Sequence, residues 1–229
     1  MPSGSDDAAS PRTPPDVAPD LLRFESLIRP TLEQRLGTRA GPAFDLLARY
    51  GSLVHSQAEI QALVAKGDRP HLFTRHVLDS LNPLSLFERP PARALDVGTG
   101  AGFPGIPLAI VWPETRFTLL ESRERKAGFV ERATRELALT NVSIVCERLE
   151  DLGRRWRIEA LEAIFVRAVG GLDSVLRYTA PSTSAGCRWV YFLGRGGEEA
   201  GLQGSLSAEG FASEIRAGLF GGRLLTGVL

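Results

Sequence analysis

Apolar residues recur at helical spacing through the first third of the chain. The spacing predicts a helix that begins at about Asp20 and ends at Gly37, since glycine commonly follows the last helical residue. The apolar positions of this helix are Leu21, Leu22, Phe24, Leu27, Ile28, Leu32 and Leu36. Residues 1–19 contain five prolines among Ser, Asp and Ala, a composition that predicts a disordered tail.

The same spacing predicts two more helices before the first strand. The second has its apolar positions at Phe44, Leu46, Leu47, Tyr50, Leu53 and Val54, and is continued or restarted by Ile60, Leu63 and Val64. Gly67-Asp68 is expected to break it. A third helix is expected over about residues 72–87, kinked or ended near Pro83. Residues 20–90 are therefore predicted to form an N-terminal helical region.

From residue 91 the pattern changes to short apolar runs that alternate with helical stretches. Strands are expected over residues 93–97, 117–121, 142–146, 163–166 and 188–193, with 211–216 and 223–228 as a closing hairpin. Helices are expected over 105–112, from an N-cap at Ser122, and over 172–179. This alternation predicts an α/β domain over residues 91–229 with a parallel, doubly wound sheet.

A glycine-rich loop follows the first predicted strand. Its pattern is D-x-G-x-G-x-G, from Asp96 through Gly98, Gly100 and Gly102, and Phe103 stands where a dinucleotide fold has its third glycine. The Asp96 carboxylate would repel a pyrophosphate, but it suits a ligand with a cationic amine and a sulfonium, such as S-adenosylmethionine (SAM). A tight turn with no ligand is the alternative for the glycines alone.

Ligands of open α/β sheets bind at the carboxyl ends of the strands. This rule places Glu121, after the second strand, at the position that holds a ribose diol. Leu149 and Glu150, after the third strand, are expected to contact an adenine, and a surface turn is their alternative. Arg167 follows the fourth strand.

The residues around these strand ends restrict the methyl acceptor. The N/D-P-P-Y sequence typical of amine methylation is absent after the fourth strand, where the chain reads Arg167-Ala168-Val169-Gly170. Methylation at pyrimidine C5 needs a nucleophilic cysteine, and both Cys146 and Cys187 are expected to be buried as small apolar residues. An acceptor with a free lone pair and no proton to lose, such as guanine N7, needs no general base.

The three histidines are His55, His71 and His76, and none has metal-ligand spacing with cysteines or acidic pairs, so no metal is expected. His76 and Ser80 share a predicted helical face with Asp79 beside it. This polar patch is expected to pack the helices on the sheet, with direct substrate contact as the alternative.

Composition adds little beyond the class of protein. The chain has 229 residues, 43% hydrophobic residues and a formal net charge of zero, so no basic field points to a nucleic-acid partner. No run approaches the 18 apolar residues of a membrane span, and no signal peptide is present. A cytoplasmic monomer without membrane contact is expected.

Three segments together resemble the RsmG family, also called glucose-inhibited division protein B. They are Arg75-His76-Val77-Leu78-Asp79-Ser80, the loop from Leu95 to Leu108 with its Gly-Phe-Pro-Gly ending, and Phe117-Thr118-Leu119-Leu120-Glu121-Ser122. The resemblance implies a Rossmann-like class I SAM-dependent methyltransferase sheet over residues 91–229. It further implies that the substrate is 16S rRNA or the small ribosomal subunit, methylated at N7 of a guanine.

The same resemblance implies a set of cofactor contacts. By motif these fall on Gly98, Phe103, Leu149, Glu150 and Arg167, with Glu121 at the acidic ribose position. Two family features are replaced: an Asn-Leu-Thr sequence by Ala62-Leu63-Val64, and a Lys-Gly after the fifth strand by Leu193-Gly194.

The function predicted is methyl transfer from SAM to guanine N7 in 16S rRNA. Arg167 is expected to support the cofactor and to position the substrate through guanine O6 or a phosphate, or else only to pair with a carboxylate such as Glu150. One alternative function is a nucleotide-dependent oxidoreductase. Another is a SAM-binding protein with a small-molecule or regulatory role.

Overall fold

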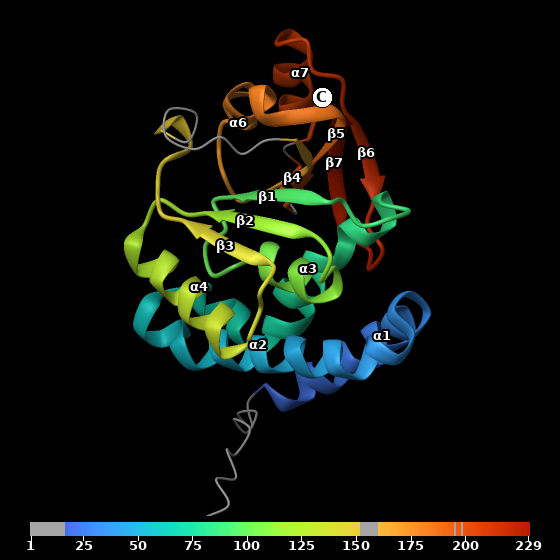
Figure 1. Ribbon diagram of the computed structural model, residues 1–229, viewed down its shortest axis with the longest axis vertical. Coiled ribbons are helices and arrows are strands. Elements are labelled where there is room, and N and C mark those ends of the chain that lie inside the picture. The colour runs from blue at the N-terminus through green and yellow to red at the C-terminus, as the bar shows by residue number, and fades with distance from the viewer. Residues whose placement is uncertain (1–16, 152–159, 195, 198) are drawn as a thin grey trace, which may run out of the picture.

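The computed structural model describes residues 17–151, 160–194, 196–197 and 199–229. Its centre is a seven-stranded sheet of order β3-β2-β1-β4-β5-β7-β6 (Figure 1). The strands are β1 (Arg93–Val97), β2 (Arg116–Leu120), β3 (Val142–Val145), β4 (Leu161–Arg167), β5 (Thr183–Phe192), β6 (Glu214–Ala217) and β7 (Arg223–Val228). The first five strands are parallel, and β7 pairs antiparallel with both β5 and β6. The predicted doubly wound sheet and closing hairpin are therefore confirmed.

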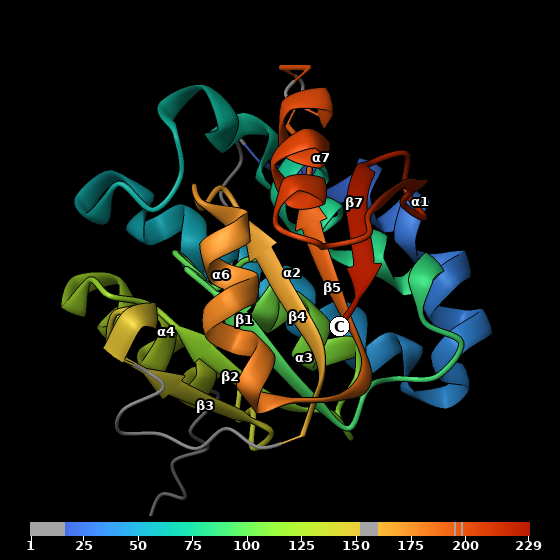
Figure 2. The same cartoon turned by 90° about the horizontal axis from the view of Figure 1, so that it is seen from above.

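Helices cover both faces of the sheet (Figures 1 and 2). One face carries α1 (Ala18–Leu36), α2 (Ala40–Gln61), α3 (Gly105–Val111) and α4 (Glu124–Glu136). The other carries α6 (Leu172–Thr179) and α7 (Glu199–Ala208). Successive residues of β4 alternate between the two cores: Phe165 packs with the N-terminal helices and Val166 packs with α6.

The first two helices are close to their predicted extents. α1 ends at Leu36, and Gly37 follows it with φ +55°, as expected. It begins at Ala18, and Val17 before it is fully buried, so the predicted tail is too long at its end. The remainder of that tail, residues 1–16, lies outside the described residues.

α2 ends at Gln61, because Ala62 takes a left-handed conformation. Leu63 and Val64 therefore follow the helix rather than continue it. The predicted break at Gly67-Asp68 is wrong, since both residues lie inside a 3-10 helix, Lys66–His71.

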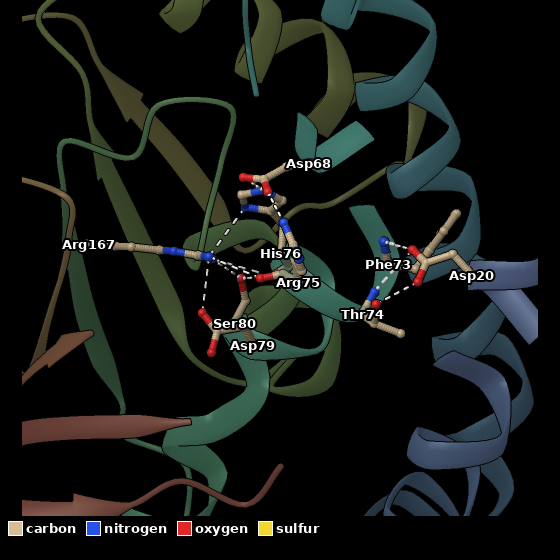
Figure 3. Close-up of polar contacts among 9 residues, drawn as sticks. All are labelled: Asp20, Asp68, Phe73, Thr74, Arg75, His76, Asp79, Ser80 and Arg167. Carbon is tan, nitrogen blue, oxygen red and sulfur yellow. Dashed lines mark hydrogen bonds and ion pairs between the residues drawn. The ribbon is translucent and has the colours of Figure 1, made fainter. Parts of the chain in front are cut away.

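The third predicted helix is helical but not an α-helix. It consists of a π-helix, Phe73–Val77, followed by a 3-10 helix, Asp79–Leu86, which contains Pro83. Asp20 of α1 accepts hydrogen bonds from the backbone N–H groups of Phe73 (2.7 Å) and Thr74 (3.3 Å) and from the Thr74 hydroxyl (2.5 Å) (Figure 3). The side chain of Asp20 thus fixes the start of the π-helix, a tertiary contact that spacing along the sequence does not reveal.

Two other features differ from the prediction. Arg123 rather than Ser122 is the residue before α4, and it makes no side-chain cap. α7 was not predicted because its sequence carries Gly201 and Gly204, which are poor helix formers. None of the described helices is long and apolar enough to cross a membrane.

Candidate functional site

A cavity of about 830 Å³, here called the first cavity, opens at the carboxyl ends of β1, β2 and β4. Its lining includes Gly98, Gly100, Phe103, Glu121, Leu149, Glu150 and Arg167. The structure therefore brings together every predicted cofactor residue except Asp96. Leu63 and Val64, which replace polar residues of the RsmG pattern, also line the first cavity.

The glycine loop is folded back against β2. The N–H groups of Gly98 and Thr99 both donate to the Leu120 carbonyl, at 2.9 and 3.0 Å. Gly98, Gly100 and Gly102 have φ of +69°, +62° and +103°, values that other residues rarely adopt. A Cβ on Gly98 would also collide with the Val169 side chain. The predicted effect of Gly98→Val therefore begins with this collision rather than with the ligand.

Asp96 lies behind the loop and is fully buried. Its Oδ2 accepts hydrogen bonds from the Thr99 hydroxyl (2.5 Å) and the Gly105 N–H (2.9 Å), so the carboxylate ties the loop to the start of α3. Its buried Oδ1 has no hydrogen-bond partner within the described part of the chain. Burial raises the pKa of Asp96 to about 7, against the lowering effect of its two donors. Direct contact between Asp96 and a ligand stays a prediction.

Glu121 is placed at the edge of the first cavity and is 6% exposed. Its Oε2 accepts a hydrogen bond from the Gly100 N–H (3.0 Å), and its Oε1 accepts one from the Arg123 N–H (2.9 Å). Because each carboxylate oxygen has about two acceptor positions, Glu121 can hold the loop and still accept from a pair of hydroxyl groups.

Arg167 connects the end of β4 to the N-terminal region (Figure 3). It forms an ion pair with Asp79 (3.0 Å) and donates to the Ser80 hydroxyl (3.3 Å) and the Arg75 carbonyl (3.2 Å). The expectation that Arg167 pairs with a carboxylate is correct, but the partner is Asp79 and not Glu150. Its guanidinium also lies 5.8 Å from the centre of the Phe103 ring.

His76 is held between Arg167 and Asp68 (Figure 3). Its Nδ1 lies 3.3 Å from the Arg167 guanidinium and its Nε2 lies 3.2 Å from the Asp68 carboxylate. Arginine can only donate, so we assign Nδ1 as an acceptor and Nε2–H as the donor to Asp68. Burial and the charge of Arg167 lower the pKa of His76 to about 4, which agrees with a neutral ring. The predicted polar patch does pack the N-terminal region on the sheet.

Sequence reasoning missed Tyr50, which is fully buried at the back of the loop. Its hydroxyl donates to the Ala101 carbonyl (2.8 Å), and its ring centre lies 5.3 Å from that of Phe103. Nothing in the helical spacing distinguishes Tyr50 from the other apolar positions of α2. Arg123 and Lys126 also line the first cavity, and their place after Glu121 at the end of β2 was the available signal.

The two cysteines differ from each other. Cys187 is buried, as predicted, and burial raises its pKa to about 12. Cys146 is exposed, so its expected burial is wrong: it follows the last residue of β3, at the edge of the sheet. Neither cysteine lines the first cavity. Within the described ranges, no group of three His, Cys, Asp or Glu residues could hold a metal ion.

Comparison with known proteins agrees with this architecture. The family model for rRNA small subunit methyltransferase G matches residues 44–203. The protein named ribosomal RNA small subunit methyltransferase G from Carboxydothermus hydrogenoformans is 36% identical, over 75% of this chain and 73% of its own length. Its namesake from Sorangium cellulosum is 37% identical, over 75% of this chain and 68% of its own.

Solved structures show the same fold at low sequence identity. A SAM-dependent methyltransferase from Aquifex aeolicus superposes with a TM-score of 0.54 at 15% identity, covering 75% of this chain and 97% of its own. This similarity confirms the class I methyltransferase fold of the sheet domain.

Proposed function

Because the chain belongs to the rRNA small subunit methyltransferase G family, we propose that it transfers a methyl group from SAM to N7 of a guanine in 16S rRNA. The first cavity takes the cofactor, and the RNA reaches it from the side of Arg167. Of the alternatives, the oxidoreductase is disfavoured by the family and by Phe103 in place of a third glycine. The family match also disfavours a purely regulatory role.

The described residues fit SAM. The ribose diol fits Glu121, whose two oxygens keep acceptor positions at the cavity edge. The adenine fits the Leu149 and Glu150 wall, and the methionine part fits the glycine loop between Gly98 and Phe103. When bound, SAM supplies a methyl group already activated by its sulfonium.

The state of His76 supports an acceptor that needs no general base. Its Nδ1 accepts from Arg167 and its Nε2–H donates to Asp68, so the neutral ring has no free lone pair to remove a proton. Guanine N7 already has a lone pair, and transfer to it requires positioning of the acceptor rather than proton abstraction. This arrangement of His76 is the observation that favours N7 over an amine or hydroxyl acceptor.

The test is methylation of RNA by the purified protein. We expect methyl incorporation from SAM into 16S rRNA or small subunits from a strain lacking the enzyme, and nucleoside mass spectrometry should identify 7-methylguanosine. Incorporation at adenine N6 or cytosine C5 would contradict the acceptor. A protein that binds SAM but methylates neither free rRNA nor the subunit would contradict the catalytic function.

We further propose that the protein acts in the cytoplasm as a monomer, with no metal. The substrate, small-subunit RNA, supports the compartment. Light scattering of the purified protein, with and without SAM, tests the oligomeric state, and a dimer would contradict it.

A further inference from the structure

A second cavity, of about 900 Å³, adjoins the first. Three residues line both cavities: His76, Arg167 and Ala168. Ala168 follows β4 directly and has a left-handed conformation, with φ +55°, which is uncommon for a residue other than glycine. The strand end is thus turned where the two cavities meet, and an acceptor atom in the second cavity would face the cofactor at this boundary.

The second cavity is aromatic but has no excess of charge. Three arginines line it, and each is paired with a carboxylate: Arg75 with Asp68, Arg167 with Asp79, and Arg223 with Glu199. Three aromatic residues also line it: Tyr191, Phe192 and Phe220. Paired charges with aromatic rings favour an uncharged, planar group over a phosphate.

The far wall of the second cavity is the turn that joins β6 to β7. Asn82, which is 1% exposed, accepts hydrogen bonds at Oδ1 from the N–H groups of Phe220 (2.8 Å) and Gly222 (3.3 Å). Its Nδ2 donates to Asp79 Oδ1 (2.8 Å). A Cβ on Gly218 would lie 2.5 Å from the Asn82 side chain, so the turn is packed closely on Asn82. The backbone of Phe220 is therefore fixed beside the Arg167–Asp79 pair.

Of the three aromatic residues, Phe220 is best placed to stack on a ligand. Tyr191 is only 9% exposed, and the Arg167 guanidinium lies 5.7 Å from the centre of the Phe192 ring. Phe220 is half-buried, and it lies on the wall of the second cavity while making no part of the first.

From these contacts, and on the premise of the proposed function, we infer that the second cavity receives the target guanine, turned out of the RNA and stacked on Phe220. Enzymes that act on a base commonly extrude it into such a pocket and hold it against an aromatic side chain. The stacked base would meet the cofactor at Ala168. Phe220 then acts on the substrate, and the glycine loop acts on the cofactor.

Substitutions at Phe220 test this role, with its neighbour Leu219 as the matched control. Leu219 lies on the same turn, is 39% exposed and does not line the second cavity. Single-turnover methylation of small subunits at saturating SAM should fall about 10- to 100-fold in Phe220→Ala and in Phe220→Leu, the scale of losing one base–aromatic stack. Phe220→Trp should keep activity near wild type, and Leu219→Ala should change it less than about twofold. SAM affinity, measured by calorimetry, should be unchanged in all four variants.

The leucine and tryptophan variants separate stacking from packing. Leucine keeps an apolar side chain on the turn without an aromatic face, so wild-type activity in Phe220→Leu would overturn the inference. Equal losses of SAM affinity and methylation would also overturn it, because the wall would then act through the first cavity. Thermal unfolding of each variant checks that the turn is intact. A wild-type protein that binds SAM and methylates no RNA would instead refute the proposed function, and this inference with it.

Discussion

Two carboxylates, Asp96 and Glu121, hold the glycine loop from opposite sides. Asp96 ties Thr99 and Gly105 together from behind, and Glu121 accepts from the Gly100 N–H at the cavity. Sequence spacing predicted both residues but not this division, because a motif gives the residue type and not the direction of the side chain. The charge of Asp96 is buried, and only Glu121 reaches the cavity edge.

Substitution of Asp96 separates its charge from its hydrogen bonds. Asp96→Ala removes both acceptor contacts and is expected to abolish SAM binding by releasing the loop. Asp96→Asn keeps one oxygen for Thr99 and Gly105, so calorimetry should show affinity within about tenfold of wild type. If Asp96→Asn is folded and also fails to bind, charge complementarity with the ligand is the larger effect. Normal affinity in Asp96→Ala would exclude both explanations.

Glu121 makes a different prediction. Glu121→Gln should weaken SAM binding by roughly 1 to 3 kcal/mol, the scale of charge-assisted hydrogen bonds, because one acceptor oxygen becomes a donor. The Gly100 and Arg123 N–H groups compete for the oxygen that remains. Titration calorimetry with SAM measures the change, and circular dichroism controls for folding. Affinity equal to wild type would place the ribose elsewhere.

The buried Asp96 should also make stability depend on pH. Its folded-state pKa is raised to about 7 from 3.8, so between these values the unfolded chain releases a proton that the folded chain keeps. Stability from Asp96 is therefore present below about pH 4 and is lost as pH rises to 7. Relative to wild type, Asp96→Asn should gain on the order of 2 to 4 kcal/mol between pH 4.5 and 7.5.

Urea unfolding of both proteins at the two pH values tests this difference. His76 acts in the opposite sense: its folded-state pKa is lowered to about 4 from 6.5, so its contribution is lost as pH falls through that range. Since His76 is present in both proteins, its effect cancels in the comparison. A difference that does not change with pH would mean that Asp96 is ionised throughout.

At the scale of elements, the π-helix is the part of the site that sequence could least predict. Residues 73–77 have an ordinary apolar spacing, and the third helix was expected to be regular. Its actual form depends on Asp20, more than 50 positions earlier, and on Arg167, about 90 positions later. By contrast, the strands and the helix α6 depend on local patterns, and their predicted bounds agree with the structure to within a few residues except at the start of β5.

The contact between the π-helix and β4 gives a prediction for Arg167 and His76. Arg167→Ala should reduce methylation more than SAM affinity, because Arg167 lines both cavities and holds Asp79, Ser80 and the Arg75 carbonyl. His76→Ala should act mainly through packing, with partial activity that shows no acid limb near the pKa of an ordinary histidine. Single-turnover rates across pH, beside SAM affinities, measure both effects.

The result that would contradict this scheme is specific. A folded His76→Ala protein without activity at saturating SAM, with Arg167→Ala near normal, would make His76 the group that acts on the substrate.

At the scale of the whole molecule, the helical region and the sheet share one core. Phe24 and Phe73 belong to the same buried cluster as Phe117 and Phe165. The predicted boundary at residue 91 therefore divides the chain by element type, and its meaning for independent folding stays a prediction. Composition could not reveal the shared core, because each part alone has an ordinary share of apolar residues.

Separate expression of residues 91–229 tests that boundary. We expect this fragment to aggregate or to lack cooperative unfolding, because one face of its sheet would expose Phe117, Phe165 and other residues that α1 and α2 cover. Calorimetry beside the full chain measures this. A fragment that unfolds cooperatively and binds SAM would show that the sheet is an autonomous domain.

The shared core also has a consequence during translation. α1 and α2 leave the ribosome first, while the strands that cover their apolar faces are still to be made. The last partner of β5 is β7, which ends at Val228, one residue before the end of the chain. The nascent chain therefore carries uncovered apolar helices through most of its synthesis. It is a natural client for chaperones that bind at the ribosomal exit tunnel.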